Sequence, residues 1–265
     1  DGHYWIATNQ GIIVLNNNGE IVKRVNKANY PNLKNEVVRS IAEVSDGVVW
    51  FGTEDGLGTY NTIKEKLVVI DAEMQNLTYL DNQFVRRIYK DSASSIWLAT
   101  VEGLYRHSAG ANVLRLYPVA NSEQDSGSPR IWGIREDSKG NLWIATQSAG
   151  LSRLNFYDAN QIIFLNDRAN QLWDLAIDEY DQIWLATSKG VELYRVNDDK
   201  LELQKTFLQG EIVDNIHLVG RNIWAWTEKE GLISIEGENT DHSSPSQNYK
   251  LKFHSDSLKD KMSSP

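Results

Sequence analysis

The chain has 265 residues, 41% of them hydrophobic and 10% aromatic, which is enough to build a substantial core. Its formal net charge of −9 argues against a nucleic-acid partner, because a phosphate-binding surface needs clustered lysine and arginine. The sequence has no cysteine, which excludes disulfides, thiolate nucleophiles and cysteine-ligated zinc.

One short pattern organises the whole chain: Trp, an apolar residue, a small residue and Thr. Its six copies begin at Trp5, Trp50, Trp97, Trp143, Trp184 and Trp224, at intervals of 40 to 47 residues. The last copy departs from the pattern, with Trp226 in place of the small residue. A fixed period of this length indicates one supersecondary unit repeated in space. Because such units depend on their neighbours, residues 1–265 are predicted to form a single domain.

Short strands are expected in every unit, in the order of the chain. Unit one starts at its second strand, since only four residues precede Trp5. The first strands of the later units are predicted at Val37–Glu43, Phe84–Tyr89, Ile131–Glu136, Leu172–Ile177 and Ile212–Leu218. In unit three, Leu104–Arg106 and Val113–Tyr117 are the third and fourth strands. Four short strands in each unit, with no helical period, predict an all-β chain of β-propeller blades.

The second strand of each unit, which carries the repeated Trp, is largely apolar on both faces. A strand placed between two neighbouring blades would be buried in this way, so we interpret the repeated Trp residues as packing residues and not as ligand platforms. Shortly after each Thr comes a glycine, which indicates a tight turn with positive φ. These glycines are Gly11, Gly56, Gly103, Gly150, Gly190 and Gly231.

Both ends of the chain are irregular. A polar stretch at 236–248 predicts a long loop, and 255–265 predicts a tail. Tyr249–Phe253 is expected to be the fourth strand of unit six; the alternative is that it supplies the missing first strand of unit one. The units then form either a closed six-bladed ring or most of a larger ring. Because the chain begins inside a repeat, we expect it to be a piece of a longer protein. No apolar run approaches the roughly 20 residues that span a bilayer, so direct membrane insertion by this segment is not expected.

Unit four reads Ile134-Arg135-Glu136-Asp137-Ser138-Lys139-Gly140-Asn141-Leu142-Trp143-Ile144-Ala145-Thr146, followed by Gly150-Leu151-Ser152-Arg153. This unit closely resembles the two-component regulator propeller repeat, and the resemblance is recognisable over nearly all the chain. The resemblance implies the periplasmic sensor domain of a bacterial membrane receptor, whose histidine kinase or diguanylate cyclase output lies beyond a membrane helix. It also implies that any homodimer forms through the full-length receptor. The Asp-x-x-Gly-x-x-Trp turn is similar to the Asp-box of sialidases, but Asp-boxes are themselves structural turns.

The sequence offers little evidence of catalysis, and we expect no catalytic residues, no metal and no cofactor. The histidines are not spaced as a metal site; they are His3, His107, His217, His242 and His254. A nucleophile elbow and a phosphate-cradling glycine loop are both absent from the sequence. The carboxylate pairs Glu136-Asp137 and Asp178-Glu179 fall in turns, where capping the turn is the simpler interpretation.

The starts of the first strands are the predicted ligand site. Because strands alternate in direction, these starts should surround the channel mouth beside the turns that follow the second strands. Their side chains differ from unit to unit while the scaffold repeats, which is typical of a grafted function. The candidate residues are Arg39, Arg86, Arg87, Trp132, Trp173, Asp174, Asp214 and Asn215.

Arginine and tryptophan at a concave mouth favour a small polar ligand or carbohydrate, held by bidentate hydrogen bonds and stacking. The alternative is that these residues line a water-filled channel and pair with one another. We therefore expect an extracytoplasmic ligand-sensing propeller with no enzymatic activity of its own. The rival hypotheses are a propeller enzyme, a lyase or glycosidase acting at the mouth, and a protein-interaction platform.

Overall fold

The computed structural model contains strands and no α-helix in the residues that it describes, in agreement with the all-β prediction. These residues are 2–67, 80, 83–108, 114–117, 130–146, 150–155, 162–164, 171–197, 200–238, 245 and 248–254. Within them, no helix is long and apolar enough to cross a membrane. The chain divides into two compact units, residues 1–131 and 132–265, which are described separately. The expected tail at 255–265 lies outside the described residues.

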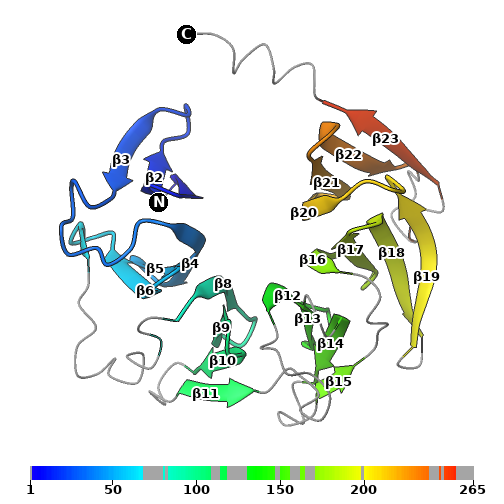
Figure 1. Ribbon diagram of the computed structural model, residues 1–265, viewed down its shortest axis with the longest axis horizontal. Helices are drawn as coiled ribbons and strands as arrows, with labels where there is room; N and C mark the ends of the chain where they lie inside the picture. The colour runs from blue at the N-terminus through cyan, green and yellow to red at the C-terminus, as the bar shows by residue number, and fades with distance from the viewer. Residues whose placement is uncertain are drawn as a thin grey trace. The chain divides into compact units, whose positions relative to one another are not determined.

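Unit 1 contains three antiparallel sheets, which we call blades 1 to 3 (Figure 1). Among the described residues, blade 1 has three strands, β1 (Tyr4–Thr8), β2 (Gly11–Leu15) and β3 (Ile21–Val25), and it starts at its second strand as predicted. Blade 2 comprises β4 (Val38–Ser45), β5 (Val48–Thr53), β6 (Gly56–Asn61) and β7 (Lys66–Leu67). Blade 3 comprises β8 (Val85–Lys90), β9 (Ile96–Thr100), β10 (Leu104–His107) and β11 (Leu114–Tyr117).

Unit 2 contains blades 4 to 6, each with four antiparallel strands in sequence order. Blade 4 comprises β12 (Ile131–Glu136), β13 (Leu142–Thr146), β14 (Gly150–Leu154) and β15 (Ile162–Phe164). Blade 5 comprises β16 (Leu172–Ile177), β17 (Ile183–Thr187), β18 (Gly190–Asn197) and β19 (Lys200–Phe207). Blade 6 comprises β20 (Val213–Val219), β21 (Asn222–Thr227), β22 (Gly231–Gly237) and β23 (Tyr249–Phe253).

The end of blade 6 decides between the two roles considered for Tyr249–Phe253. This segment is β23 and pairs with β22, so it is the fourth strand of the sixth repeat. The pairing extends to Glu236 and Gly237, which lie opposite Lys250 and Tyr249. The predicted loop at 236–248 therefore starts two residues later than expected, because its first two residues complete the ladder. Residues 239–244, 246 and 247 are outside the described part.

The hydrophobic core lies between successive blades of each unit. Trp50 packs with Val85 and Ile88 of β8, so it faces the first strand of the following blade. Trp143 packs in the same way with Leu172 and Leu175 of β16. The repeated Trp residues of blades 2 to 5 are at most 2% exposed, as the packing interpretation requires. A tryptophan buries roughly 150–250 Å² in such a position, so the repeat concentrates its apolar area where blades meet.

The small residue two positions after each Trp is explained by the same contact. A Cβ atom on Gly52 would lie 2.4 Å from the carbonyl oxygen of Val85, because β5 approaches the backbone of β8. Blade 6 is the last blade of unit 2 and carries Trp226 at this position, where it is 48% exposed. Trp226 therefore replaces the small residue on the face of blade 6 that no other described blade of unit 2 covers.

The turns on either side of the second strand are held by side chains of the repeat. In blades 3, 4 and 5 an aspartate six residues before the Trp accepts the indole N–H; the distances are 2.7 Å for Asp91, 2.9 Å for Asp137 and 3.0 Å for Asp178. After the strand, the Thr hydroxyl donates to the carbonyl of the turn glycine, as Thr187 does to Gly190 at 3.0 Å. Gly190 has φ 127°, and a Cβ there would lie 2.2 Å from the Phe207 carbonyl oxygen.

Candidate functional site

The first strands begin with a β-bulge in blades 2, 3, 5 and 6, and these bulges contain seven of the eight predicted site residues, all except Trp132 of β12. In blade 2, Val38 pairs with Thr53 and Ser40 pairs with Gly52, so Arg39 and Ser40 together face one residue of β5. The equivalent pairs are Arg86 and Arg87 in β8, Trp173 and Asp174 in β16, and Asp214 and Asn215 in β20. A bulge redirects side chains at the end of a ladder, and bulges are frequent beside functional sites.

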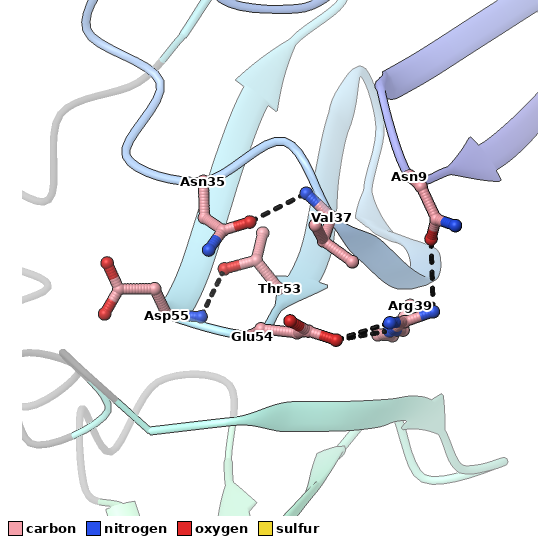
Figure 2. Close-up of polar contacts among 7 residues, drawn as sticks. All are labelled: Asn9, Asn35, Val37, Arg39, Thr53, Glu54 and Asp55. Atoms are coloured by element: carbon pink, nitrogen blue, oxygen red, sulfur yellow. Dashed lines mark hydrogen bonds and ion pairs between the residues drawn. The ribbon is translucent and has the colours of Figure 1, made fainter.

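Arg39 connects the turns of two blades at this end of unit 1. Its Nε donates to Oε1 of Glu54 at 3.1 Å, and its Nη2 contacts the same oxygen. Its Nη1 donates to Oδ1 of Asn9 at 3.2 Å. Glu54 lies in the β5–β6 turn and Asn9 in the β1–β2 turn, so the start of β4 lies beside both turns (Figure 2).

Local hydrogen bonds fix the backbone around Arg39. Oδ1 of Asn35 accepts from the amide of Val37 at 2.7 Å, which shapes the chain just before β4. Oγ1 of Thr53 accepts from the amide of Asp55 at 3.1 Å, which holds the turn that carries Glu54 (Figure 2). Both bonds are side-chain-to-backbone contacts typical of tight turns. They place Glu54 where it can reach Arg39.

The next arginines come from β8, which packs beside β4. Oγ of Ser40 accepts from the amide of Ile88 at 3.0 Å, so the bulge of β4 is joined directly to β8. Arg86 and Arg87 are both half-buried. The guanidinium of Arg86 lies 4.5 Å from the ring centroid of Phe84. Stacking of this kind holds the guanidinium plane in a fixed orientation.

Like charges gather around Arg86. Its pKa is lowered to about 10, mainly by burial. The positive charges of Arg130, Arg39 and Arg87 contribute to this lowering, in that order, whereas the carboxylate of Glu54 raises the pKa. With a pKa of about 10, Arg86 is still protonated at neutral pH.

In unit 2, the predicted tryptophans form an aromatic pair. The rings of Trp132 and Trp173 have centroids 5.1 Å apart at 69°, an edge-to-face arrangement between β12 and β16. Both side chains are half-buried, and Trp173 also packs against the core between blades 5 and 6. The indole nitrogen of Trp173 is buried with no hydrogen-bond partner among the described residues. The pair therefore has a packing role, and Trp173 contributes a buried donor to it.

Asp174 differs from the expectation that it would face a ligand, since it is only 2% exposed. Its Oδ1 accepts from the amide of Leu175 at 2.9 Å and lies 3.9 Å from Nη2 of Arg135. A Cβ on Gly133 would come within 2.9 Å of the same oxygen. Asp174 is thus enclosed between β12 and β16, because the neighbouring strand approaches closely at glycine. We exclude it from the ligand-contacting residues.

Asp214 and Asn215 are exposed on β20, as a ligand site requires. Asn215 lies opposite Trp226 of β21, so a polar side chain and an exposed indole share this edge of blade 6. Of the eight predicted residues, Arg39, Arg86 and Arg87 gather in unit 1 and the other five belong to unit 2. That all of them serve a single ligand stays a prediction.

The sequence reasoning missed three residues of the unit 1 site: Asn9, Glu54 and Arg130. Asn9 and Glu54 each follow the repeated Thr directly, at a position that varies along the chain: Asn9, Glu54, Val101, Gln147, Ser188 and Glu228. The same comparison that selected the first-strand starts would have found them. Arg130 lies just before β12, outside the repeated positions, and no local pattern distinguishes it.

Other reactive groups in the described residues are accounted for by structure. No three His, Asp or Glu side chains of the described part gather as metal ligands. Ser234 lies 3.0 Å from Nε2 of His254, but it is buried and its hydroxyl donates to Glu236 at 2.9 Å. The His254 ring packs on Trp224 with centroids 4.7 Å apart. We interpret this Ser–His contact as part of the packing of β22 and β23.

Comparison with known proteins supports the repeat assignment. The family model described as two component regulator propeller matches residues 32–55 and 125–148, each time a first strand, its turn and the following second strand. The chain is 26% identical over 230 residues to a histidine kinase, P4, of Formosa agariphila. That alignment covers 82% of this chain and 16% of the kinase, so the chain spans a small part of that relative.

Solved structures share the fold. The extracellular domain of a hybrid two component system from B. thetaiotaomicron superposes with a TM-score of 0.71 at 21% identity, covering 91% of this chain and 32% of that one. A virginiamycin B lyase from Staphylococcus aureus superposes with a TM-score of 0.67 at 14% identity, covering 88% of this chain and 76% of the lyase. At these identities the likeness shows the fold, an all-β assembly of propeller blades, and not the activity.

Proposed function

Because the chain carries repeats of the two-component regulator propeller family, we propose that it is the ligand-sensing propeller of a bacterial signal-transduction receptor. In this proposal the domain is extracytoplasmic and periplasmic. It binds a small polar ligand or carbohydrate at the bulged starts of the first strands and performs no chemistry of its own. The output domain, a histidine kinase or diguanylate cyclase, belongs to the full-length receptor, as does any homodimer.

The observation that carries the proposal is the contrast between scaffold and bulge. The Trp, Asp, Thr and Gly residues of the repeat have the same contacts in several blades, whereas the bulge pairs carry arginine in blade 3 and aspartate with asparagine in blade 6. Residues that vary on a repeating scaffold, and that a bulge directs away from the ladder, are suited to ligand recognition. The kinship with a histidine kinase and with a receptor's extracellular domain supports a signalling role.

The proposal is tested in the intact receptor with its transcriptional or kinase output as readout. We expect that replacing Arg39 and Arg86 by Gln and Asp214 by Asn together abolishes the response to an inducing extract. The melting temperature of the 265-residue chain should change little, because exposed or half-buried polar residues have few packing contacts to lose. A matched triple change at exposed outer positions, Arg24→Gln, Arg115→Gln and Glu202→Gln, should leave the response intact. An unchanged response in the site variant would contradict the proposal.

The rival functions make different demands on the same site. A lyase or glycosidase needs an accessible acid or base beside a bound substrate, which at the bulges leaves Asp214 as the exposed carboxylate. An interaction platform needs an extended surface and would tolerate a change at any single bulge pair. No contact of the described residues favours either rival over the sensor.

A further inference from the structure

The Trp-bearing second strand is paired on both edges in blades 2 to 6 but on one edge in blade 1. β9, for example, pairs with β8 and with β10. Within the described residues, β1 pairs with β2 alone. The backbone N–H and C=O groups along its other edge have no strand partner there, and such an edge is a template for pairing with a further strand.

The side chains of β1 are less well covered than those of the other second strands. Trp5 and Ala7 pack against the core between blades 1 and 2, yet both are half-buried. Their counterparts Trp143 and Ala145 also pack against the following blade, and they are 1% and 0% exposed. The two strands differ because β13 has the first strand β12 beside it, whereas β1 has no first strand in the described part.

A cavity of about 370 Å³ lies between β1 and β4, with Trp5 on one side and Ile41 and Ala42 on the other. In the next pair of blades the first strands lie side by side, since Oγ of Ser40 accepts from the amide of Ile88 at 3.0 Å. A first strand of blade 1 would lie beside β4 in the same way. The space next to β1 is therefore open to such a strand.

The sequence of β1 does not protect its edge. Proteins discourage unwanted pairing at edge strands with charged residues, proline or bulges. The edge strands β3, β4 and β23 follow this rule, with Lys23 and Arg24, with Arg39, and with Lys250 and Lys252. β1 reads Tyr-Trp-Ile-Ala-Thr and has neither a charge nor a proline. An apolar strand of this kind is suited to an edge that is covered.

The register of the other blades defines which strand fits. In blades 2, 3, 5 and 6, one apolar residue of the first strand lies opposite the repeated Thr. A second apolar residue, three positions later, lies opposite the residue that follows the Trp. These pairs are Val38–Thr53 and Ile41–Phe51, Val85–Thr100 and Ile88–Leu98, Leu172–Thr187 and Leu175–Leu185, and Val213–Thr227 and Ile216–Ala225. A strand added to β1 in this register has apolar residues opposite Thr8 and Ile6, and Ile6 is 42% exposed.

The described residues contain no spare first strand. β4, β8, β12, β16 and β20 are each paired within their own blade. The apolar residues of the segment 255–265, Leu258 and Met262, are four positions apart and not three, so they do not match the register. The aligned region is 16% of the histidine kinase and 32% of the extracellular domain described above, so relatives of this chain have further segments that could supply a strand.

We propose that the edge of β1 binds an extended segment of the same receptor polypeptide, from outside residues 1–265, as the first strand of blade 1. The segment has an apolar residue opposite Thr8, then two variable residues, then an apolar residue opposite Ile6. Main-chain hydrogen bonds to β1 provide the attachment, and the alternating side chains cover Ile6 on one face and enter the cavity beside Ile41 on the other. The inference rests on the proposal that the chain is part of a longer receptor, but not on the ligand site.

The test adds synthetic peptides to the 265-residue chain. The site peptide has the sequence of residues 36–45, which contains the pattern in Val38 and Ile41, and the control peptide has Asp at both positions. We expect the site peptide to bind at least tenfold more tightly in fluorescence anisotropy, and to slow hydrogen exchange of the β1 amides at least tenfold. Ile6→Asp should weaken its binding at least tenfold, whereas Ile21→Asp, at a position of β3 that is 51% exposed, should change binding less than twofold.

Several outcomes would overturn the inference. They are equal binding of the two peptides, no binding of the site peptide up to about 1 mM, binding that survives Ile6→Asp in a chain with a normal melting curve, and protection that appears on β3 or β23 in place of β1. A dimer of the chain that Ile6→Asp dissociates in sedimentation would assign the edge to a second copy, which also contradicts the proposal. The ligand site is tested separately by the response of the intact receptor, and none of these outcomes changes that result.

Discussion

The indole nitrogen of Trp143 donates a 2.9 Å hydrogen bond to Oδ2 of Asp137, six residues earlier in the chain. Oδ1 of the same carboxylate accepts from the amides of Lys139 and Asn141, so one aspartate shapes the turn and orients the core tryptophan. This double role explains why the turn and the tryptophan recur together. Blade 2 has a shorter turn with Val44 at the equivalent position, and the indole nitrogen of Trp50 has no acceptor among the described residues.

Asp137→Ala should therefore destabilise the fold by about 1–3 kcal/mol, the cost of leaving a buried donor and two turn amides without their acceptor. The measurement is chemical denaturation followed by tryptophan fluorescence. Asp46→Ala, in the exposed turn of blade 2, is the control and should stay within about 0.5 kcal/mol of the parent. Equal effects of the two changes would contradict the structural role given to Asp137.

Trp143→Ala should destabilise the protein by about 3–5 kcal/mol, as large-to-small changes in a core do, because Trp143 is 1% exposed. Trp226→Ala removes the same side chain from a position that is 48% exposed and should cost far less. Thermal melting of both variants provides the comparison. If the Trp143 variant keeps its melting temperature and instead loses a ligand, the packing interpretation of the repeat is wrong.

Arg86→Gln should leave the melting temperature unchanged or raise it. The pKa of Arg86 is lowered to about 10 in the folded protein, so folding disfavours the protonated form relative to the unfolded chain. At neutral pH the charge on Arg86 therefore lowers the free energy of unfolding. This destabilising contribution decreases as the pH rises above the folded-state pKa. A neutral side chain at this position removes the contribution at every pH. A marked loss of stability on this change, measured by calorimetry at pH 7, would show that Arg86 is structural.

The sensor proposal predicts that the isolated chain shows no turnover of glycosides, esters or phosphoesters. The hydroxyl of the buried Ser234 donates a hydrogen bond to Glu236. Asp214 is the exposed carboxylate at the bulges and hence the residue to test. Steady hydrolysis that disappears in Asp214→Asn and persists in Asp46→Asn would favour the propeller-enzyme hypothesis over the sensor.

The positions of the strands could be predicted from the sequence, because the turn residues and the repeated Trp mark where each strand begins and ends. The first strands of blades 4 and 5 are observed at the predicted residues, Ile131–Glu136 and Leu172–Ile177. The bulges could not be predicted from the sequence, because a bulge is an extra residue in one strand that is defined only by the pairing of that strand with the adjacent strand. Two-residue periodicity looks the same on both sides of Arg39, although Arg39 has no partner of its own on β5.

The composition of the site was predicted only in part, for a related reason. Arg39, Arg86 and Arg87 were found because they break a repeat, but Arg130 joins them through tertiary structure alone. Asp174 breaks the repeat equally well and is nevertheless buried, because Gly133 lets β12 approach it. Variation along a repeat indicates where the scaffold is free to change. Whether a side chain reaches a ligand depends on which neighbour packs over it.

The most direct test of the ligand site is a map of backbone amide chemical-shift changes when an inducing extract is added to the isotope-labelled chain. The account predicts that the largest changes fall on the bulges of β4 and β8 and on the β5–β6 turn, at Arg39, Ser40, Arg86, Arg87 and Glu54. The amide signals of the turns before the second strands, such as the turn that contains Asp137, should not shift. Changes confined to those turns, or to the outer strands β3 and β19, would contradict the claim that the bulged strand starts bind the ligand.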